Sequence, residues 1–394
     1  MKEIVYGLEG IEQSDIDIFT DMITYVSEYI YGITKQKDKL VLEIEDTREE
    51  EILKKIKELR GYLKLDDVKK GRNVETKILE DYEENEAINE ISPFDELIRT
   101  GSIVEMTDGV YGYSGLFLKV FKYFNDKIEE FGRKTFKDII EFEDSILYTV
   151  KEYERGLYFE SFPHHLCFET NMKSDVELLD RFSKNGASDP EIFDIVNFKK
   201  PKNILRHAAC VPIYPILENR VIEEDKPVYY MVSGKCFRNE DKNATELSRL
   251  NEFYMKEYVC VGTYDQTIRM IEEAKALWHY WIDTFKLKCT IETANDSFFA
   301  NNYKKLKIFQ IMGNSKQEFR VDLPHSKNQC AVSSANVHRT HFTKTYNIHS
   351  ENSLCSSSCF AFGVERLTYA LLCQKGLDVN KWDEATRKEI FGDE

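Results

Sequence analysis

The stretch CFRNEDKNATELSRLNEFYMKEYV, residues 236–259, restricts the fold of this chain more than any other part of its sequence. It lies between two segments rich in β-branched and aromatic residues, VYYMVSGKCFR at 228–238 and NEFYMKEYVCVG at 251–262, which are typical of strands. A strand, a polar loop and a return strand bring the residues at the loop ends to one face. We therefore predict that Arg238 and Phe253 lie close together on a strand pair.

Composition excludes several classes of protein. The chain has 394 residues, 42% hydrophobic and 13% aromatic, so it can bury a sizeable core, and its length indicates two domains. A formal net charge of −16 argues against a large nucleic-acid interface, because phosphate binding depends on clustered Lys and Arg. No apolar run approaches bilayer length and the first residues lack signal-peptide features, so we expect a cytoplasmic protein without membrane contact. The nine cysteines have no regular spacing, which indicates free thiols available for packing or metal.

The chain divides into two parts with different patterns. Residues 1–92 alternate strands and helices, with a strand in KLVLEIED (39–46) and a helix in TREEEILKKIKELRGYLK (47–64), and predict a small α/β domain. This part has 24 acidic and 14 basic residues and carries no recognisable chemical motif, so it has no assigned role. The acidic stretch 79–93, which ends at Pro93, is predicted to be a linker.

The larger part, residues 93–394, predicts an α+β domain with an antiparallel sheet and helices packed around it. Apolar spacing predicts helices at 114–132 and 265–286. Besides the two strands around the opening loop, LKCTIETA (287–294) and KIFQIMG (307–313) are predicted to be strands.

The opening loop has the residue types of an ATP site. An Arg at a strand end, Arg238, suits a phosphate through its planar fork of donors. Phe253 offers a stacking face for a purine, and Glu240 can accept a hydrogen bond from an exocyclic amine. The alternative is a solvated hairpin with an ordinary core Phe.

The stretch SSSCFAFGVERLTYALLCQKG, residues 356–376, offers a second phosphate-binding group. A strand of small residues runs into Gly363, and a helix is predicted to begin near Val364 with Arg366 in its first turn. An Arg at a helix start meets an unfavourable dipole unless an anion is nearby. The alternative is an ion pair of Arg366 with Glu365 or another carboxylate. Together, the two Arg sites favour a triphosphate clamp.

These motifs resemble those of a known family. CFRNE…RLNEFYMKEY is similar to motif 2 of class II aminoacyl-tRNA synthetases, and FGVER to their motif 3. Residues 94–376 resemble more closely the amino acid:[carrier protein] ligases, which are truncated homologues of the atypical zinc-dependent seryl-tRNA synthetases. The resemblance implies a class II synthetase-like sheet flanked by helices. It rests on six stretches in the same order: AACVPIYP (208–215), CFRNE (236–240), MKEYVCVGT (255–263), ETANDSFF (292–299), SSANVHRTHF (333–342) and CFAFGVERL (359–367).

The resemblance implies a zinc ion held by Cys210, Glu257 and Cys359. All three residue types are competent ligands, and three protein ligands leave one tetrahedral position open, which in the family receives the amino group of the amino acid. The alternative is three ordinary buried residues, since buried Cys is common.

The resemblance also implies the ATP contacts. Arg238 would hold the α-phosphate and the attacking carboxylate, and Glu240 would accept from the adenine amino group. Phe253 would stack on adenine, Arg249 would touch the outer phosphates, and Arg366 would hold the γ-phosphate. Of these, Arg238 and Arg366 are the expected catalytic residues, because positive charge stabilises the crowded transition state.

The chain departs from the family pattern in places. Magnesium is implied as a cofactor, but Ala331 stands where the seryl enzymes have a Glu before a Ser-Ser pair, so its ligands stay open. Ala361 replaces a motif 3 glycine. Motif 1, which would support a homodimer, is expected in the helix 114–132 and in a strand near DIIEFED (138–144), without the usual Pro.

Several histidines and a Cys pair are weaker candidates. Cys355 and Cys359 near His349 resemble a ligand cluster, but no second pair completes it. We expect three of the histidines to be structural or solvated, namely His164, His165 and His207. The other two, His338 and His341, would lie behind the metal ligands.

The expected function is ATP-dependent activation of a small amino acid, glycine or alanine, to an aminoacyl-adenylate. The aminoacyl group would then pass to the phosphopantetheine thiol of a separate carrier protein, without tRNA. Two basic stretches could dock that carrier, NFKKPKN (197–203) and NNYKKLK (301–307). Two alternatives remain: a divergent seryl-type aminoacyl-tRNA synthetase, and a catalytically idle synthetase-like module used for binding or regulation.

Overall fold

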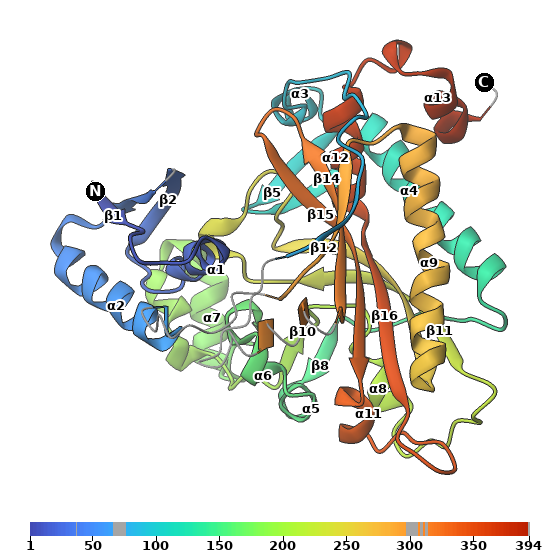
Figure 1. Ribbon diagram of the computed structural model, residues 1–394. Coiled ribbons are helices and arrows are strands. Elements are labelled where there is room, and N and C mark those ends of the chain that lie inside the picture. The colour runs from blue at the N-terminus through green and yellow to red at the C-terminus, as the bar shows by residue number, and fades with distance from the viewer. Residues whose placement is uncertain (37, 66–75, 297–305, 308–309, 312–313, 393–394) are drawn as a thin grey trace.

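The computed structural model describes residues 1–36, 38–65, 76–296, 306–307, 310–311 and 314–392 (Figure 1). Residues 1–65, hereafter the N-terminal unit, contain the strands β1 (Lys2–Gly7), β2 (Ile30–Gln36) and β3 (Lys39–Ile44), the helices α1 (Gln13–Ile23) and α2 (Glu49–Tyr62), and the short helix η1 (Asp46–Arg48). The strands form an antiparallel sheet in the order β1-β3-β2. The buried side of α2 has helical spacing, since Ile52, Ile56 and Leu59 face a core of their own.

An eight-stranded sheet organises the larger part of the chain. Its order is β4-β13-β14-β15-β16-β12-β11-β7, and each neighbouring pair is antiparallel except β11 and β7, which are parallel. The expected sheet is therefore confirmed, with a parallel pair at one edge. The strands are β4 (Ile78–Asp81), β7 (Ile140–Glu143), β11 (Val228–Phe237), β12 (Glu252–Gly262), β13 (Cys289–Thr293), β14 (Lys316–Leu323), β15 (Asn328–Arg339) and β16 (Ser356–Gly363).

The two faces of this sheet carry different layers. One face packs on three helices, α4 (Gly115–Thr135), α9 (Tyr264–Phe285) and α12 (Val364–Lys375), around an aromatic core that includes Trp278, Trp281 and Phe362. Figure 1 shows α9 running along β16 on this side. The other face packs on a second core around Tyr153 and Tyr214, supplied by short helices and a small sheet in the order β8-β10-β9.

Shorter elements connect these layers. They are α3 (Phe94–Arg99), β5 (Ile103–Thr107), β6 (Val110–Tyr113), β8 (Leu147–Thr149), α5 (Val150–Arg155), α6 (Tyr158–Ser161), η2 (Pro163–His165), β9 (Cys167–Glu169), α7 (Val176–Asn185), η3 (Gly186–Ser188), η4 (Pro190–Phe193), η5 (Ile195–Asn197), β10 (Asn203–Leu205), α8 (Ile213–Ile216), η6 (Asp241–Asn243), α11 (His341–Thr345), η7 (Val379–Lys381) and α13 (Glu384–Phe391). Among the described helices, none combines the length and the apolar character needed to cross a membrane.

Two expectations from the sequence differ from the structure. The expected linker 79–93 begins as β4, which pairs with β13, and Asn85 donates to the carbonyl of Leu287 at 2.9 Å. An edge strand needs only backbone hydrogen bonds on one side, so acidic composition did not reveal it. In the expected strand 307–313, the described residues 307, 310 and 311 are helical. A short apolar run does not distinguish a strand from a buried helical turn.

Candidate functional site

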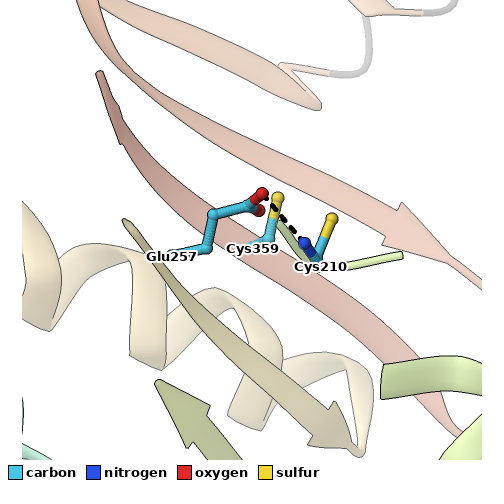
Figure 2. Close-up of side chains that lie close together, drawn as sticks. All are labelled: Cys210, Glu257 and Cys359. Carbon is cyan, nitrogen blue, oxygen red and sulfur yellow. Dashed lines mark hydrogen bonds between the residues drawn. The ribbon is translucent and has the colours of Figure 1, made fainter. Parts of the chain in front are cut away.

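Cys210, Glu257 and Cys359 come together on the sheet face opposite α9 (Figure 2). β12 and β16 are paired so that Glu257 lies opposite Ala361, and Cys359 lies two residues further along on the same face. A long side chain spans this diagonal separation between neighbouring strands. Cys210 reaches the same point from the turn that precedes α8. The sequence positions implied by the family resemblance are therefore adjacent in space.

The three side chains form a tight and buried cluster. Their ligand atoms all lie within 4.8 Å of one another, and the exposed fractions of the residues are 7% for Cys210, 1% for Glu257 and 4% for Cys359. The backbone N–H of Cys210 donates to Oε1 of Glu257 at 3.0 Å, the hydrogen bond drawn in Figure 2. This bond fixes the carboxylate beside the two sulfur atoms.

The surroundings of Cys210 and Cys359 disfavour the ionised form of both thiols. The hydrogen bond with Cys359, burial and the Glu257 charge all raise the pKa of the Cys210 thiol. For Cys359, the hydrogen bond with Cys210 lowers the pKa, but burial and the Glu257 charge outweigh it and raise the pKa. Three acidic groups, two thiols and one carboxylate, therefore lie together, and none of them can neutralise a negative charge on another. A divalent cation would offset this arrangement, and it would bind with release of thiol protons.

The donor set fits a zinc ion. Glu257 is buried, yet within the described part of the chain it pairs with no Lys or Arg. A buried carboxylate without a cationic partner is costly, and metal coordination is one of the ways in which proteins compensate it. Two thiolates and one carboxylate oxygen suit zinc, and such a three-residue set leaves one coordination position open.

Two polar side chains contact the cluster from β15. Nε2 of His338 lies 3.6 Å from Sγ of Cys359, and Nδ2 of Asn336 lies at the same distance from that sulfur. Nδ1 of His338 is 3.0 Å from the hydroxyl of Tyr214, and burial lowers the pKa of His338 to about 3, so the ring is neutral. His338 therefore contacts a candidate metal ligand, as expected, whereas the ring of His341 packs on Phe342.

Arg238 and Phe253 lie together at the loop ends of β11 and β12, as their positions in the sequence predict. The guanidinium carbon of Arg238 is 5.1 Å from the ring centroid of Phe253. Nε of Arg238 donates to the carbonyl of His207 at 3.1 Å. His207 lies three residues before Cys210. Arg238 and Phe253, the expected phosphate and purine contacts, therefore lie close to the cluster of Cys210, Glu257 and Cys359.

Glu240 and Arg249 face each other across the loop between β11 and β12. Glu240 is 4% exposed, and its carboxylate lies 3.6 Å from Nη1 of Arg249. Nη2 of Arg249 donates to Oδ2 of Asp21 at 2.8 Å. Asp21 lies on α1 in the N-terminal unit, which the sequence left without a role. No motif connects these positions, because 228 residues separate them.

Arg366 lies in the first turn of α12, at the place the sequence predicts. Its Nη1 donates to the carbonyl of Ala331 at 3.1 Å. The alternative partner Glu365 points elsewhere and accepts from the backbone N–H of Tyr254 at 2.8 Å. Ala331, where the seryl enzymes have a Glu, is thus adjacent to the expected phosphate ligand and offers only its carbonyl.

A row of partly buried charges on and beside β13 and β14 was missed by sequence reasoning. Arg320 pairs with Glu292 at 3.2 Å and with Glu318 at 3.0 Å. Lys316 pairs with Glu318 at 3.2 Å and also with Asp296. Alternation of acidic and basic residues in KQEFRVDL (316–323) was the available signal. Such alternation is also common on solvated strands, so the sequence alone does not reveal these ion pairs.

The weaker metal candidates do not join the cluster. Cys355 and His349 lie outside the group of ligand atoms around Cys359. Nδ1 of His207 lies 3.2 Å from the hydroxyl of Tyr153, and the rings of His164 and His165 pack at a tilt with their centroids 4.0 Å apart. All nine cysteines are free, which agrees with the expectation from their spacing.

Known proteins resemble the larger part of this chain. The tRNA synthetase class II core domain family (G, H, P, S and T) matches residues 196–375. An amino acid--[acyl-carrier-protein] ligase 2 from Bradyrhizobium diazoefficiens is 31% identical over 244 residues, covering 59% of this chain and 69% of that protein. A type-2 serine--tRNA ligase from Methanocaldococcus jannaschii is 30% identical over 255 residues, covering 59% of this chain but only 46% of that protein.

Solved structures show the same fold. A seryl-tRNA synthetase from M. kandleri, crystallised with tRNASec from A. aeolicus, superposes with a TM-score of 0.70 at 19% identity, and the match covers 99% of this chain and 78% of that one. The chain therefore belongs to the class II aminoacyl-tRNA synthetase family, where its relatives include amino acid--[acyl-carrier-protein] ligases and type-2 serine--tRNA ligases.

Proposed function

We propose that this protein is a cytoplasmic amino acid:[carrier protein] ligase that activates glycine or alanine with ATP. The observation that carries the proposal is the convergence of two groups on one sheet face. Cys210, Glu257 and Cys359 form the metal cluster, and Arg238 and Phe253 lie beside the loop that leads to it. An α-amino acid and a nucleotide can therefore meet there.

The first step would form the adenylate. A carboxylate oxygen of the amino acid attacks the α-phosphorus, a new O–P bond forms, and the bond to the β-phosphate oxygen breaks to release pyrophosphate. Arg238 would neutralise the charge that develops at the α-phosphate, and Arg366 and Arg249 would hold the outer phosphates, with magnesium as their counter-ion. Glu240 and Phe253 would hold the adenine.

Zinc held by Cys210, Glu257 and Cys359 would bind the amino group of the substrate. Because the zinc would need an amino group to bind, the site would select an α-amino acid over a hydroxy acid. Buried side chains surround the cluster, so little room is expected for a large substrate side chain. A pocket distinguishes side chains by about 1–3 kcal/mol per methylene, which would allow both glycine and alanine to react.

The second step would transfer the aminoacyl group. The phosphopantetheine thiol attacks the carbonyl carbon of the adenylate, a C–S bond forms, and the C–O bond to AMP breaks. The B. diazoefficiens relatives support a carrier as the acceptor, because this chain spans 69% and 72% of their length. The surface offers a matching patch, since Lys199 and Lys200 are exposed beside Ile195, which is 87% exposed. In the other basic stretch, 301–305 lie outside the described residues, and Lys307 is 7% exposed and pairs with Asp15.

A homodimer is part of this proposal. The helix and the strand in which motif 1 is expected are α4 and β7, and β7 forms one edge of the eight-stranded sheet. Its outer edge pairs with no strand in the described part of the chain, so a second copy could continue the packing.

One experiment separates the candidate functions. Enzyme, ATP and labelled amino acid are incubated in parallel with apo carrier, holo carrier and bulk tRNA, and pyrophosphate exchange is measured alongside. Label on holo carrier alone supports the ligase. Label on tRNA would favour a seryl-type synthetase, which the type-2 serine--tRNA ligase relatives keep as the second candidate. Absence of amino-acid-dependent pyrophosphate exchange would exclude both enzyme functions and leave the catalytically idle module.

A further inference from the structure

The N-terminal unit is joined to the loop between β11 and β12. The end of α1 and the turn after it contact η6 and its neighbours, so two segments far apart in the sequence form one interface. Several hydrogen bonds connect them, among them Asn243 Nδ2 to the Asp21 carbonyl at 3.0 Å, the Lys242 backbone N–H to the Thr24 hydroxyl at 3.3 Å, and the Tyr25 hydroxyl to the Asn239 carbonyl at 2.7 Å.

α1 is held by charge near both of its ends. Asp15 in its first turn pairs with Lys307 at 3.0 Å, and both side chains are buried. Asp21 near its last turn pairs with Arg249 at 2.8 Å, with side-chain exposed fractions of 25% and 34%. Partial burial shields these pairs from water and salt, which makes them stronger than fully exposed pairs.

The guanidinium of Arg249 is placed between two carboxylates. Nη2 donates to Asp21, and Nη1 faces Glu240 at 3.6 Å. Burial lowers the pKa of Arg249, but the charges of Asp21 and Glu240 raise it by more, so the guanidinium remains charged. A phosphate group is gripped by this same pair of terminal nitrogens. The fork expected to touch the outer phosphates is therefore engaged by protein carboxylates.

We infer that the ion pair between Asp21 and Arg249, hereafter the lock, must break when ATP binds. The outer phosphates of ATP would replace the Asp21 carboxylate on the guanidinium, and the end of α1 would loosen from the loop. This inference rests on the proposed function, because it requires that the loop bind ATP. The inference assigns a role to the N-terminal unit. Docking of this unit on the loop weakens ATP binding, and ATP binding weakens the docking by the same factor in the equilibrium constant.

Asp21→Asn tests the lock directly. The substitution removes the charge but keeps the shape, and it leaves the backbone carbonyl that Asn243 uses. Isothermal calorimetry with magnesium-ATP and with AMP should show that the variant binds ATP about three- to tenfold more tightly. Affinity for AMP, which lacks outer phosphates, should not change. Asp17→Asn is the matched control, because Asp17 lies on the same helix, is 83% exposed and pairs with Lys35.

Hydrogen exchange of the wild-type protein gives a second, independent measurement. ATP should increase exchange of backbone amides around residues 21–25, AMP should not, and the effect of ATP should be smaller in Asp21→Asn. ATP affinity that is unchanged or weaker in Asp21→Asn would overturn the lock alone. Failure of both proteins to bind ATP and AMP would overturn the proposed nucleotide site, and the lock with it.

Discussion

The guanidinium of Arg238 lies over the ring of Phe253, 5.1 Å from its centroid, while its Nε holds the carbonyl of His207. This one side chain therefore joins the end of β11, the start of β12 and the segment that leads to Cys210. A cation over an aromatic face contributes about 0.5–1 kcal/mol at exposed sites and more where water is excluded. The arrangement holds the guanidinium of Arg238, the proposed contact of the α-phosphate, in one place, which would reduce the conformational entropy that ATP binding must overcome.

Arg238→Ala should reduce amino-acid-dependent pyrophosphate exchange about a hundred- to a thousandfold. The reason is the loss of a fixed positive charge where charge develops in the transition state. Arg238→Lys should recover little of this rate, because an ammonium group lacks the planar fork. Arg99→Ala on α3, an exposed Arg paired with Glu96, should exchange at the wild-type rate. Exchange within threefold of wild type in Arg238→Ala would exclude the assigned role.

Metal content tests the cluster of Cys210, Glu257 and Cys359. Purified protein should contain close to one zinc per chain by mass spectrometry of the metal, because the three buried donors have no cationic partner within the described residues. Cys210→Ser and Cys359→Ser should each lose most of this zinc, since a hydroxyl is a far poorer ligand than a thiolate.

The control for this test is Cys355→Ser. Cys355 is also buried, at 3%, and lies four residues before Cys359, but it is outside the cluster. It should retain zinc at the wild-type level. Zinc-free wild-type protein with full exchange activity would contradict the metal assignment.

Much of this site could be predicted from the sequence because its parts are local. Arg238, Glu240, Phe253 and Glu257 lie within one strand, loop and strand, and strand pairing alone determines which of them share a face. Cys359 joins them because β16 pairs with β12. The family resemblance implied only that Cys359 and Glu257 hold the same zinc, and the strand pairing comes from the structure. Residue types in one strand, loop and strand, together with one known family, were enough to predict which of these residues lie together.

Other relationships carry no local signal. Asp21 and Arg249 are ordinary charged residues in acidic or polar surroundings, and only tertiary packing brings them together. The edge strand β4 and the helical residues 307, 310 and 311 were also missed, because each depends on what packs beside it. A sequence pattern reports periodicity and composition, whereas these features depend on contacts across the fold.

The buried Glu365 predicts a pH dependence of stability. Burial raises its pKa to about 7 from an ordinary value of 4.5, although Lys235 and the N–H of Tyr254 oppose the shift. Because the pKa in the folded state is raised, the contribution of Glu365 to stability is fully present below about pH 4.5 and is lost as the pH rises through about 7. The folded state thus prefers the protonated acid.

Glu365→Gln should remove this loss, because a neutral amide can accept from Tyr254 at every pH. Urea unfolding of the variant and the wild type at pH 5 and pH 8 measures the difference. Relative to wild type, the variant should gain on the order of 2 kcal/mol in free energy of unfolding between the two values. Glu384→Gln, at an exposed position on α13, should show no such gain. An equal difference at both pH values would show that Glu365 is ionised in the folded state throughout.

The surface before β10 predicts where a carrier protein docks. Lys199 and Lys200 are exposed and follow the exposed apolar residues Ile195 and Val196, and β10 leads from this patch toward Cys210. A carrier presents a small acidic surface around its phosphopantetheine arm, so opposite charge would steer its approach. The patch therefore offers both charge and apolar area at the start of the segment that reaches Cys210.

Reversing both charges, with Lys199→Glu and Lys200→Glu, should raise the KM for holo carrier about tenfold. Pyrophosphate exchange should keep its wild-type rate, because the substitutions are on the surface and leave adenylate formation intact. The same double reversal at Lys54 and Lys57 on α2 is the control, since it changes the net charge equally on a different surface. Equal loss of transfer in the two double variants would mean that net charge alone governs docking. A fall in exchange together with transfer would mean that the patch supports the active site rather than the carrier.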